Sequence, residues 1–217
     1  MCNSQINPEL LTLIGKDEKI LWKGRPNRLC FLLEAVFNPL LPIAFIWGLI
    51  DFSIFSAAFH QEGFPKEMGI FFIGFFALHL MPVWIYLAGV VFSFLRYKNT
   101  SFAITDQGVY VSGGMFTQNY DRKPFTEMSH VNLSRGVFDR WLGVGDVIMT
   151  SNHDTYNIKN HIFKGTSIYD IKDYTNVYQL IKKLQTDMYA DTMYPNDMRP
   201  NENHGYNTRY DTSDLFK

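Results

Sequence analysis

The feature that most constrains this chain is a run of 28 residues, positions 68–95, that contains no Asp, Glu, Lys or Arg. About 20 apolar residues are enough for a helix to cross the hydrocarbon core of a bilayer. Helices of water-soluble proteins rarely run this long without a charged side chain. We therefore predict a transmembrane helix over residues 68–95. Pro82 should kink it, and neighbouring groups must then take up the backbone carbonyl that the proline leaves free.

An earlier apolar run covers residues 29–59 and is less regular. Its interruptions are Glu34, Asn38, Pro39, Pro42 and Asp51. We interpret residues 29–38 as an interfacial amphipathic segment and residues 39–59 as another span, with Pro39 near the first turn, where proline is tolerated. The loop over residues 60–67 is short and contains Gly and Pro, so the two spans should form a helical hairpin.

The distribution of basic residues predicts the orientation of this hairpin. Before and after the two spans stand Lys16, Lys19, Lys23, Arg25, Arg28, Arg96 and Lys98, whereas the loop carries one Lys and two Glu. Cytoplasmic flanks of membrane helices are enriched in Lys and Arg. We therefore expect a multi-pass protein of the plasma (inner) membrane with both termini in the cytoplasm.

Two ionisable residues, Asp51 and His79, lie inside the apolar runs. Counted from the loop, they are 9 and about 11 residues deep, or roughly 13 and 16 Å at 1.5 Å per residue. Two antiparallel helices would bring them to the same level. One hypothesis is a hydrogen-bonded Asp51–His79 pair that holds the hairpin together or serves a proton-linked step, since intramembrane charges usually find partners. In the alternative, Asp51 is neutral or snorkels and His79 only packs.

After Lys98 the hydrophobic pattern changes to a period of two, which is typical of strands. We predict strands over residues 102–105, 109–111, 117–122, 127–135, 146–151 and 156–163. A period near 3.6 then predicts an amphipathic helix over residues 169–189. A curved antiparallel sheet closed by one such helix forms a half-open barrel. The predicted fold class is thus an α+β membrane protein, with a two-helix hairpin followed by this barrel.

Several short motifs occur in a fixed order along residues 16–188. They are EKILWKGRP at 18–26, then Tyr97, Thr100, Phe102, Ile104, Thr105 and Gly108 followed by Val-Tyr-Val, a turn at Gly114, Pro124, and RWLGVGDVI at 140–148. In this order, with paired spans between, they resemble the bacterial pleckstrin-homology (PH-like) membrane proteins. The resemblance implies a PH-like cytoplasmic domain, which has seven strands. We count six, so residues 18–24 supply an edge strand, or two strands are merged within 117–135.

The expected organisation has four parts: a cytoplasmic segment over residues 1–28, the hairpin over 29–95, the PH-like domain over 96–190 and a tail over 191–217. The tail is rich in Asn, Asp, Thr and Tyr and poor in aliphatic residues. Such a composition buries too little apolar surface to fold, so we expect the tail to be disordered.

The sequence carries no recognisable catalytic motif. It has no H-E-x-x-H, no G-x-S-x-G and no glycine-rich phosphate loop. His153, Asp154 and His161 fall in a predicted turn and strand, where polar residues are ordinary. Cys2 and Cys30 have no C-x-x-C spacing, and Cys30 is best explained as a small buried hydrophobe. We predict no enzyme, metal, cofactor or small-molecule substrate, and the net charge of −1 gives no support for nucleic-acid binding.

Our first functional hypothesis is a membrane-anchored scaffold or adaptor that binds a protein partner, or a second copy, through a sheet edge or a helix-flanking groove. A second is an accessory subunit of a transport or export complex, using Asp51 and His79. A third is binding to anionic lipid of the bilayer. The candidate lipid-binding residues are Arg122, Lys123, Arg135 and Arg140. Phosphoinositide binding is not implied, because the loop at residues 106–108 lacks the basic residues of eukaryotic PH sites.

Overall fold

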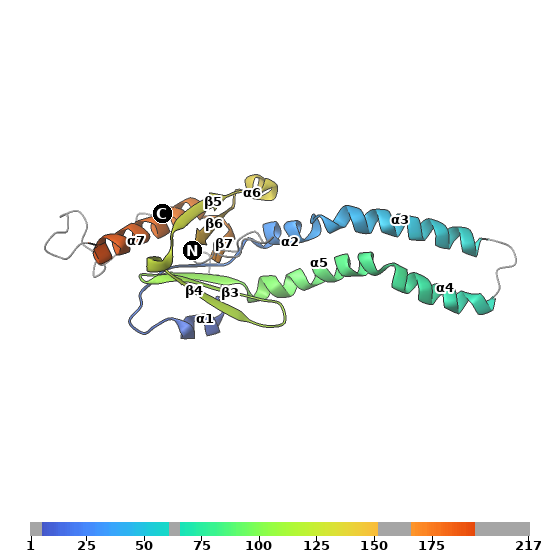
Figure 1. Ribbon diagram of the computed structural model, residues 1–217, viewed down its shortest axis with the longest axis horizontal. Helices are drawn as coiled ribbons and strands as arrows, with labels where there is room; N and C mark the ends of the chain where they lie inside the picture. The colour runs from blue at the N-terminus through green and yellow to red at the C-terminus, as the bar shows by residue number, and fades with distance from the viewer. Residues whose placement is uncertain (1–5, 61–65, 152–165, 194–217) are drawn as a thin grey trace. The chain divides into compact units, whose positions relative to one another are not determined.

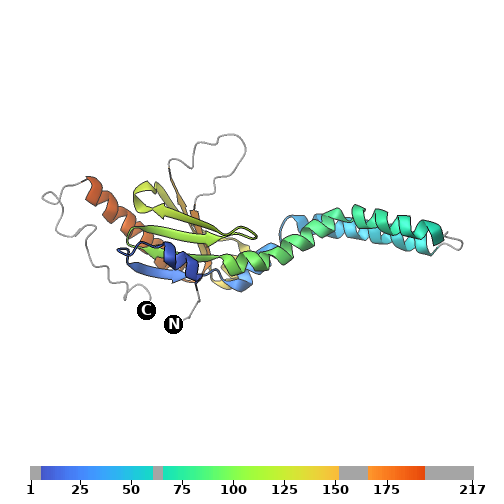
Figure 2. The same cartoon turned by 90° about the horizontal axis from the view of Figure 1, so that it is seen from below.

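The computed structural model describes residues 6–60, 66–151 and 166–193 (Figures 1 and 2). The chain divides into two compact units. One unit combines Met1–Phe31 with Leu95–Lys217, and the other is Leu32–Phe94. Residues from both sides of the apolar region thus contribute to the first unit, so we call it the split domain. We call the second the helical unit.

The split domain contains two antiparallel sheets. The first has the strand order β1 (Ile20–Gly24), β2 (Ser101–Thr105), β3 (Gly108–Gly113) and β4 (Asn119–Pro124). The second has the order β5 (His130–Ser134), β6 (Gly145–Thr150) and β7 (Thr166–Ile171). A 3₁₀ turn, Phe125–Glu127, links them. With β1 included, the described part of the chain has the seven strands that the resemblance implies.

Strand β1 forms within residues 18–24, the segment considered as an edge strand. It pairs antiparallel with β2, and Gly24 lies opposite Phe102. The whole helical unit is therefore inserted between two hydrogen-bonded neighbours of one sheet. Within residues 117–135 the structure has two strands, β4 and β5, so no further strand is needed there.

The main core lies between the sheets and α7 (Tyr174–Met193). Alternation along β2 places Phe102 and Ile104 in this core. Helix α7 adds an apolar stripe at three- and four-residue spacing, formed by Val177, Leu180, Ile181 and Leu184. Contacts of α7 with the 3₁₀ turn, β5 and β6 show that it closes one side of the second sheet.

The other face of the first sheet is covered as well. Helix α1 (Pro8–Leu13) lies beside this sheet (Figures 1 and 2), and the fully buried Leu10 packs with Ala103 and Tyr110. This is why all five residues of β2 are buried. The sequence pattern had predicted no element at α1, because six residues are too short for a clear period.

One boundary prediction was wrong: the helix expected over residues 169–189 begins at Tyr174. The preceding Thr166–Ile171 is strand β7, in which Ile171 pairs with Gly145 and Ile168 with Val147. The spacing of Ile171 and Tyr174 fits a helix, but pairing with β6 decides the conformation of Ile171. The strand predicted over residues 156–163 and most of the predicted tail lie outside the described residues.

A short helix, α6 (Val137–Leu142), was not anticipated from the RWLGVGDVI motif. It ends at Gly143, whose φ of 68° is the left-handed conformation that glycine adopts without strain. Gly114 has a φ of 124°, and a Cβ there would lie 1.9 Å from the Thr117 carbonyl oxygen. The two glycines of the motifs are thus required by the backbone of their turns.

The helical unit is built from apolar helices. They are α2 (Arg28–Val36), α3 (Leu40–Phe59), α4 (Lys66–His79) and α5 (Met81–Asn99), of which α2 and α5 begin or end in the split domain. Leu40–Ala58 of α3 is long and apolar enough to cross a membrane, and only 11% of this stretch is buried. The run expected as one kinked span is two helices bent by 54°, and it counts as a second candidate span only if the pair is taken together.

Candidate functional site

The two ionisable residues of the apolar runs lie next to each other in the helical unit. Asp51 is in the middle of α3 and His79 is the last residue of α4. His79 Nδ1 is 2.8 Å from Asp51 Oδ1. In the tautomer that carries its proton on Nδ1, His79 donates this hydrogen bond to the carboxylate oxygen. The Asp51 side chain is 2% exposed and the His79 side chain 39% exposed. Asp51 is therefore buried within the unit, whereas His79 lies partly at its surface.

Two tryptophans stabilise the bend that presents His79. Helix α4 ends one residue before Leu80, and its last carbonyls therefore lack helical donors. Trp47 Nε1 donates to the His79 carbonyl at 2.9 Å, and Trp84 Nε1 donates to the Ala77 carbonyl at 3.0 Å. Pro82 follows as the second residue of α5, a position where its missing N–H is tolerated.

Aromatic rings also restrain the imidazole of His79. The Phe75 ring stacks on it with a centroid distance of 5.3 Å, and the Trp47 ring lies 5.2 Å away. Together with the hydrogen bond to Asp51, these contacts fix the ring on three sides. The pair is therefore a preorganised polar feature in an otherwise apolar unit.

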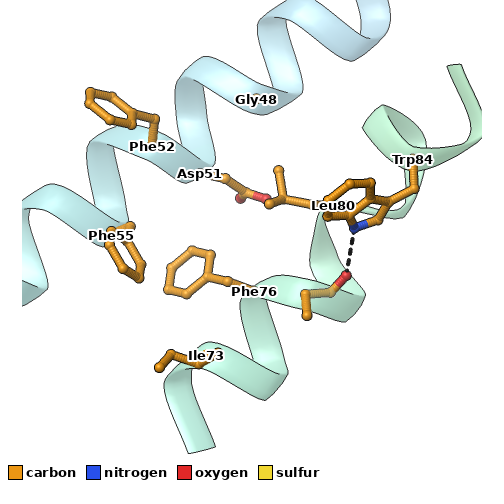
Figure 3. Close-up of a pocket in the computed structure, with 9 residues that line it drawn as sticks. Gly48, Asp51, Phe52, Phe55, Ile73, Phe76, Leu80 and Trp84 are labelled. Carbon is orange, nitrogen blue, oxygen red and sulfur yellow. Dashed lines mark hydrogen bonds between the residues drawn. The ribbon is translucent and has the colours of Figure 1, made fainter. Parts of the chain in front are cut away.

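A pocket of about 470 Å³ adjoins Asp51 (Figure 3). Its lining residues come from α3, α4, the bend and α5: Gly48, Asp51, Phe52, Phe55, Ile73, Phe76, Ala77, Leu80 and Trp84. Figure 3 shows Asp51 extending from α3 toward Leu80, with Phe55 and Phe76 nearby. Asp51 Oδ2 is buried and has no hydrogen-bond partner among the described residues.

The structure does not gather the four candidate lipid-binding residues into one patch. Arg122 and Lys123 lie near the end of β4 that leads into the 3₁₀ turn. Arg135 and Arg140 follow β5 at its opposite end, about 17 Å along a five-residue strand. The two pairs therefore occupy different ends of the split domain's sheets.

Three of these four side chains have partners within the protein. Arg122 Nη2 donates to Glu18 Oε1 at 3.2 Å. Lys123 is 8% exposed and donates to Ser151 Oγ at 2.9 Å. Arg135 Nε donates to the Val144 carbonyl at 2.9 Å. Arg140 is exposed on α6.

Glu18, the first residue of the EKILWKGRP motif, joins β1 to the neighbouring strands. It accepts hydrogen bonds from Thr105 Oγ1 at 2.8 Å and from the Tyr110 hydroxyl at 2.9 Å, in addition to Arg122. Burial, and next the hydrogen bond to Glu18, raise the pKa of Tyr110 to about 12. This network connects motif residues that precede the helical unit to motif residues that follow it.

The split domain also contains a cluster of metal-ligand atom types. Donor atoms of Cys30, Asp139 and Asp170 lie within 4.8 Å of one another, and Cys30 Sγ donates to Asp139 Oδ1 at 3.2 Å. Burial, followed by the hydrogen bond to Asp139, raises the pKa of the Cys30 thiol. His153, Asp154 and His161 lie outside the described residues.

Sequence reasoning found Asp51 and His79 but missed the residues around them. Phe55 follows Asp51 by four positions and Phe76 precedes His79 by three, and such spacings share a helix face. That signal was available. It was hidden because phenylalanine is frequent throughout these runs.

The fold and site together define an α+β protein whose domain of two antiparallel sheets and helix α7 carries an apolar helical unit, inserted in the sequence between β1 and β2. Residues 39–184 match the family described as Bacterial PH domain. The chain belongs to this family, as its motifs had indicated. Comparisons with curated proteins and with solved structures each found no match.

Proposed function

We propose that this protein is a membrane-anchored adaptor of the plasma membrane, without catalytic activity, whose PH domain presents a protein-binding surface in the cytoplasm. The observation that carries this proposal is the pairing of Gly24 with Phe102 on either side of the helical unit. The apolar segment leaves and re-enters the domain at adjacent strands. An anchor attached in this way is joined to the domain through two chain segments, one after β1 and one before β2, which lie next to each other in the sheet.

The same pairing supports a two-span topology. Both ends of the insertion meet at one β ladder, which is on one side of the membrane. A segment that enters the bilayer and returns to its starting side crosses an even number of times. The insertion contains α3 and the bent pair α4–α5, so two crossings fit its length and composition.

The surface of the helical unit supports immersion in lipid. Large apolar side chains are exposed along α3 and α4, among them Phe52 at 70%, Ile70 at 82%, Phe71 at 71% and Leu78 at 81%. A contiguous apolar surface of this kind marks a membrane or protein contact rather than a water-facing surface. With the basic flanks, it supports the assignment of both termini to the cytoplasm.

The proposed partner surface combines β5 with α6. Strand β5 is an edge of the second sheet, and four of its five residues are exposed. Helix α6 projects from the end of β5 (Figure 1) and exposes Trp141 at 74% and Val137 at 82%. An open strand edge accepts an added strand, and exposed Trp and Arg side chains are common interface hot spots. The exposed Arg140 of α6 then forms part of this surface.

Photo-crosslinking in intact membranes tests the adaptor proposal. A photoreactive amino acid at Asn132 of β5 should give a discrete adduct with another protein chain, and Trp141→Ala should reduce its yield severalfold. The matched control is the same amino acid at Lys182, an exposed residue of α7, which should give none of this adduct. Adducts that are absent, confined to lipid, or unaffected by Trp141→Ala would argue against the proposal.

A second candidate function is support of transport or export. The observation in its favour is the Asp51–His79 pair in the apolar unit, since intramembrane ionisable pairs often mark ion or substrate paths. Two spans alone enclose no pore, so this function requires an oligomer or a partner. Crosslinked oligomers whose formation depends on Asp51 would favour it over a simple anchor.

A further inference from the structure

The pocket beside Asp51 has an unusual combination of properties. Its walls are apolar and aromatic, with Phe52, Phe55, Phe76 and Trp84 among them. Its volume of about 470 Å³ is within the range of small-molecule sites. Asp51 Oδ2, which is buried, has no hydrogen-bond partner among the described residues. The pocket thus combines apolar walls with one unsatisfied carboxylate oxygen.

The polar groups of this pocket leave a partner for a ligand that donates a hydrogen bond, but none for a ligand that only accepts one. The indole N–H of Trp84 already donates to the Ala77 carbonyl at 3.0 Å, and Figure 3 marks this bond of Trp84 with a dashed line. The imidazole of His79 is already hydrogen-bonded to Asp51 Oδ1. The remaining lining side chains carry no hydrogen-bond donors. A ligand with only acceptor groups would therefore find no partner here, whereas an N–H donor would find one at Asp51.

Charge narrows the ligand class further. A carboxylate in an apolar site is stabilised by a paired opposite charge. Aromatic faces also attract cations, most strongly when water is excluded. Together, Asp51 and the four aromatic side chains favour a positively charged group with an apolar body.

We propose that this pocket binds a protonated lipophilic amine, whose N–H donates to Asp51 Oδ2 while its apolar body fills the space between α3, α4 and α5. This inference goes beyond the proposed adaptor function and does not depend on it. A lipid acyl chain could fill the same space, but its binding would be indifferent to the carboxylate. The charge dependence of binding therefore distinguishes the two occupants.

The test measures binding of propranolol, an aromatic secondary amine, to the full-length protein in nanodiscs of zwitterionic lipid. Equilibrium dialysis against empty nanodiscs corrects for partition into lipid. We expect saturable binding at one site per chain. A neutral analogue, in which an ether oxygen replaces the amine nitrogen, should bind at least tenfold more weakly.

Two variants complete the experiment. Asp51→Asn keeps the size of the side chain but removes its charge, and should weaken propranolol binding at least tenfold. Asp173→Asn removes an exposed carboxylate of the split domain and should bind like the wild type. If Asp51→Asn fails to fold, the amine and its neutral analogue are compared on the wild type by thermal shift, where only the amine should stabilise. Equal binding of both compounds, or no binding above empty nanodiscs, would overturn the proposal.

Discussion

Gly24 and Phe102 are paired across the β1–β2 ladder although the entire helical unit lies between them in the sequence. The first β-hairpin of the PH domain thus has the helical unit in place of its turn. Two further contacts tie the same region together: the Asn27 N–H donates to the Asp170 carbonyl at 2.7 Å, and the Phe31 and Tyr97 rings lie 5.9 Å apart. The domain is therefore complete only when residues from before the insertion are included.

Because the split domain contains its full set of strands without the helical unit, we predict that it folds when this insertion is removed. We expect a protein in which about eight Gly and Ser residues replace residues 32–94 to be soluble without detergent and to unfold cooperatively. Such a linker reaches roughly 26 Å, ample for the gap beside the neighbouring Phe31 and Tyr97 rings. Circular dichroism during heating measures the transition.

The control for this experiment is the fragment over residues 96–190, which lacks α1 and β1. It exposes the face of the first sheet that Leu10 covers and removes one of the two hydrogen-bonded neighbours of β2. We expect it to aggregate or to unfold at a much lower temperature. Equal stability of the fragment and the linked protein would show that the residues before the insertion are not part of the domain.

The Asp51–His79 contact predicts a non-additive double-mutant cycle. His79→Leu leaves the buried Asp51 carboxylate without its donor, whereas Asp51→Leu with His79→Leu removes both polar groups. The double variant should be no less stable than His79→Leu, because an unpaired buried charge costs more than a lost pair. Side-chain hydrogen bonds within membranes average about 0.6 kcal/mol, so thermal shifts of a few degrees are expected in nanodiscs.

A substitution at an exposed position of α4 controls for general effects on the helices. Leu78, which precedes His79 and is 81% exposed, should tolerate Leu78→Val with little change. Strictly additive losses for Asp51→Leu and His79→Leu would indicate that the two side chains do not interact.

The raised pKa of Tyr110 predicts a loss of stability in alkali. In the folded protein the phenol keeps its proton up to about pH 12, because it is buried and bonded to Glu18. The unfolded chain releases the same proton near pH 10. Stability from this group is thus fully present below pH 10 and is lost as the pH rises toward 12.

Denaturant unfolding of the linked split domain between pH 9 and pH 12 measures this effect. Tyr110→Phe should flatten the decline, although Tyr169, whose pKa is also raised by burial, contributes to what remains. A profile unchanged by Tyr110→Phe would mean that its phenol titrates alike in the folded and unfolded states.

Cys30 is predicted to be unreactive in the native protein. Its side chain is fully buried, and burial together with the hydrogen bond to Asp139 raises the pKa of the thiol. Since the thiolate is the nucleophile, maleimide should label Cys30 in a Cys2→Ser background only after denaturation. Thr186→Cys in the same background, at an exposed position of α7, should label rapidly. Fast native labelling of Cys30, followed by mass spectrometry, would contradict the packing at the start of α2.

The elements with strict alternation were predictable from the sequence. Strands β2 and β3 lie almost where the pattern placed them, since apolar residues alternate between two buried faces. Strand β1 was harder to assign, because its partner β2 lies beyond the whole insertion and local sequence does not report such pairing. The end of strand β7 was misassigned, because Ile171 precedes Tyr174 by three positions, as on a helix, and only its pairing with Gly145 of β6 makes it part of a strand.

The candidate site was predictable in part. Asp51 and His79 stood out as ionisable residues in apolar runs, and counting residues from the loop put them at similar depth. The pocket did not stand out, because its phenylalanines resemble those that face outward. Whether four basic residues form a patch depends on strand topology, which separates Arg122 and Lys123 from Arg135 and Arg140.

The central claim is that the apolar insertion is a two-span anchor with the PH domain on the cytoplasmic side. Accessibility of single cysteines in a background without native cysteines tests it most directly, with Glu62→Cys in the predicted outer loop and Lys182→Cys on α7. In intact cells, a membrane-impermeant maleimide should label position 62, and should label position 182 only after the membrane is permeabilised. Labelling of both positions from the same side, or recovery of the protein in the soluble fraction after carbonate washing, would contradict the account.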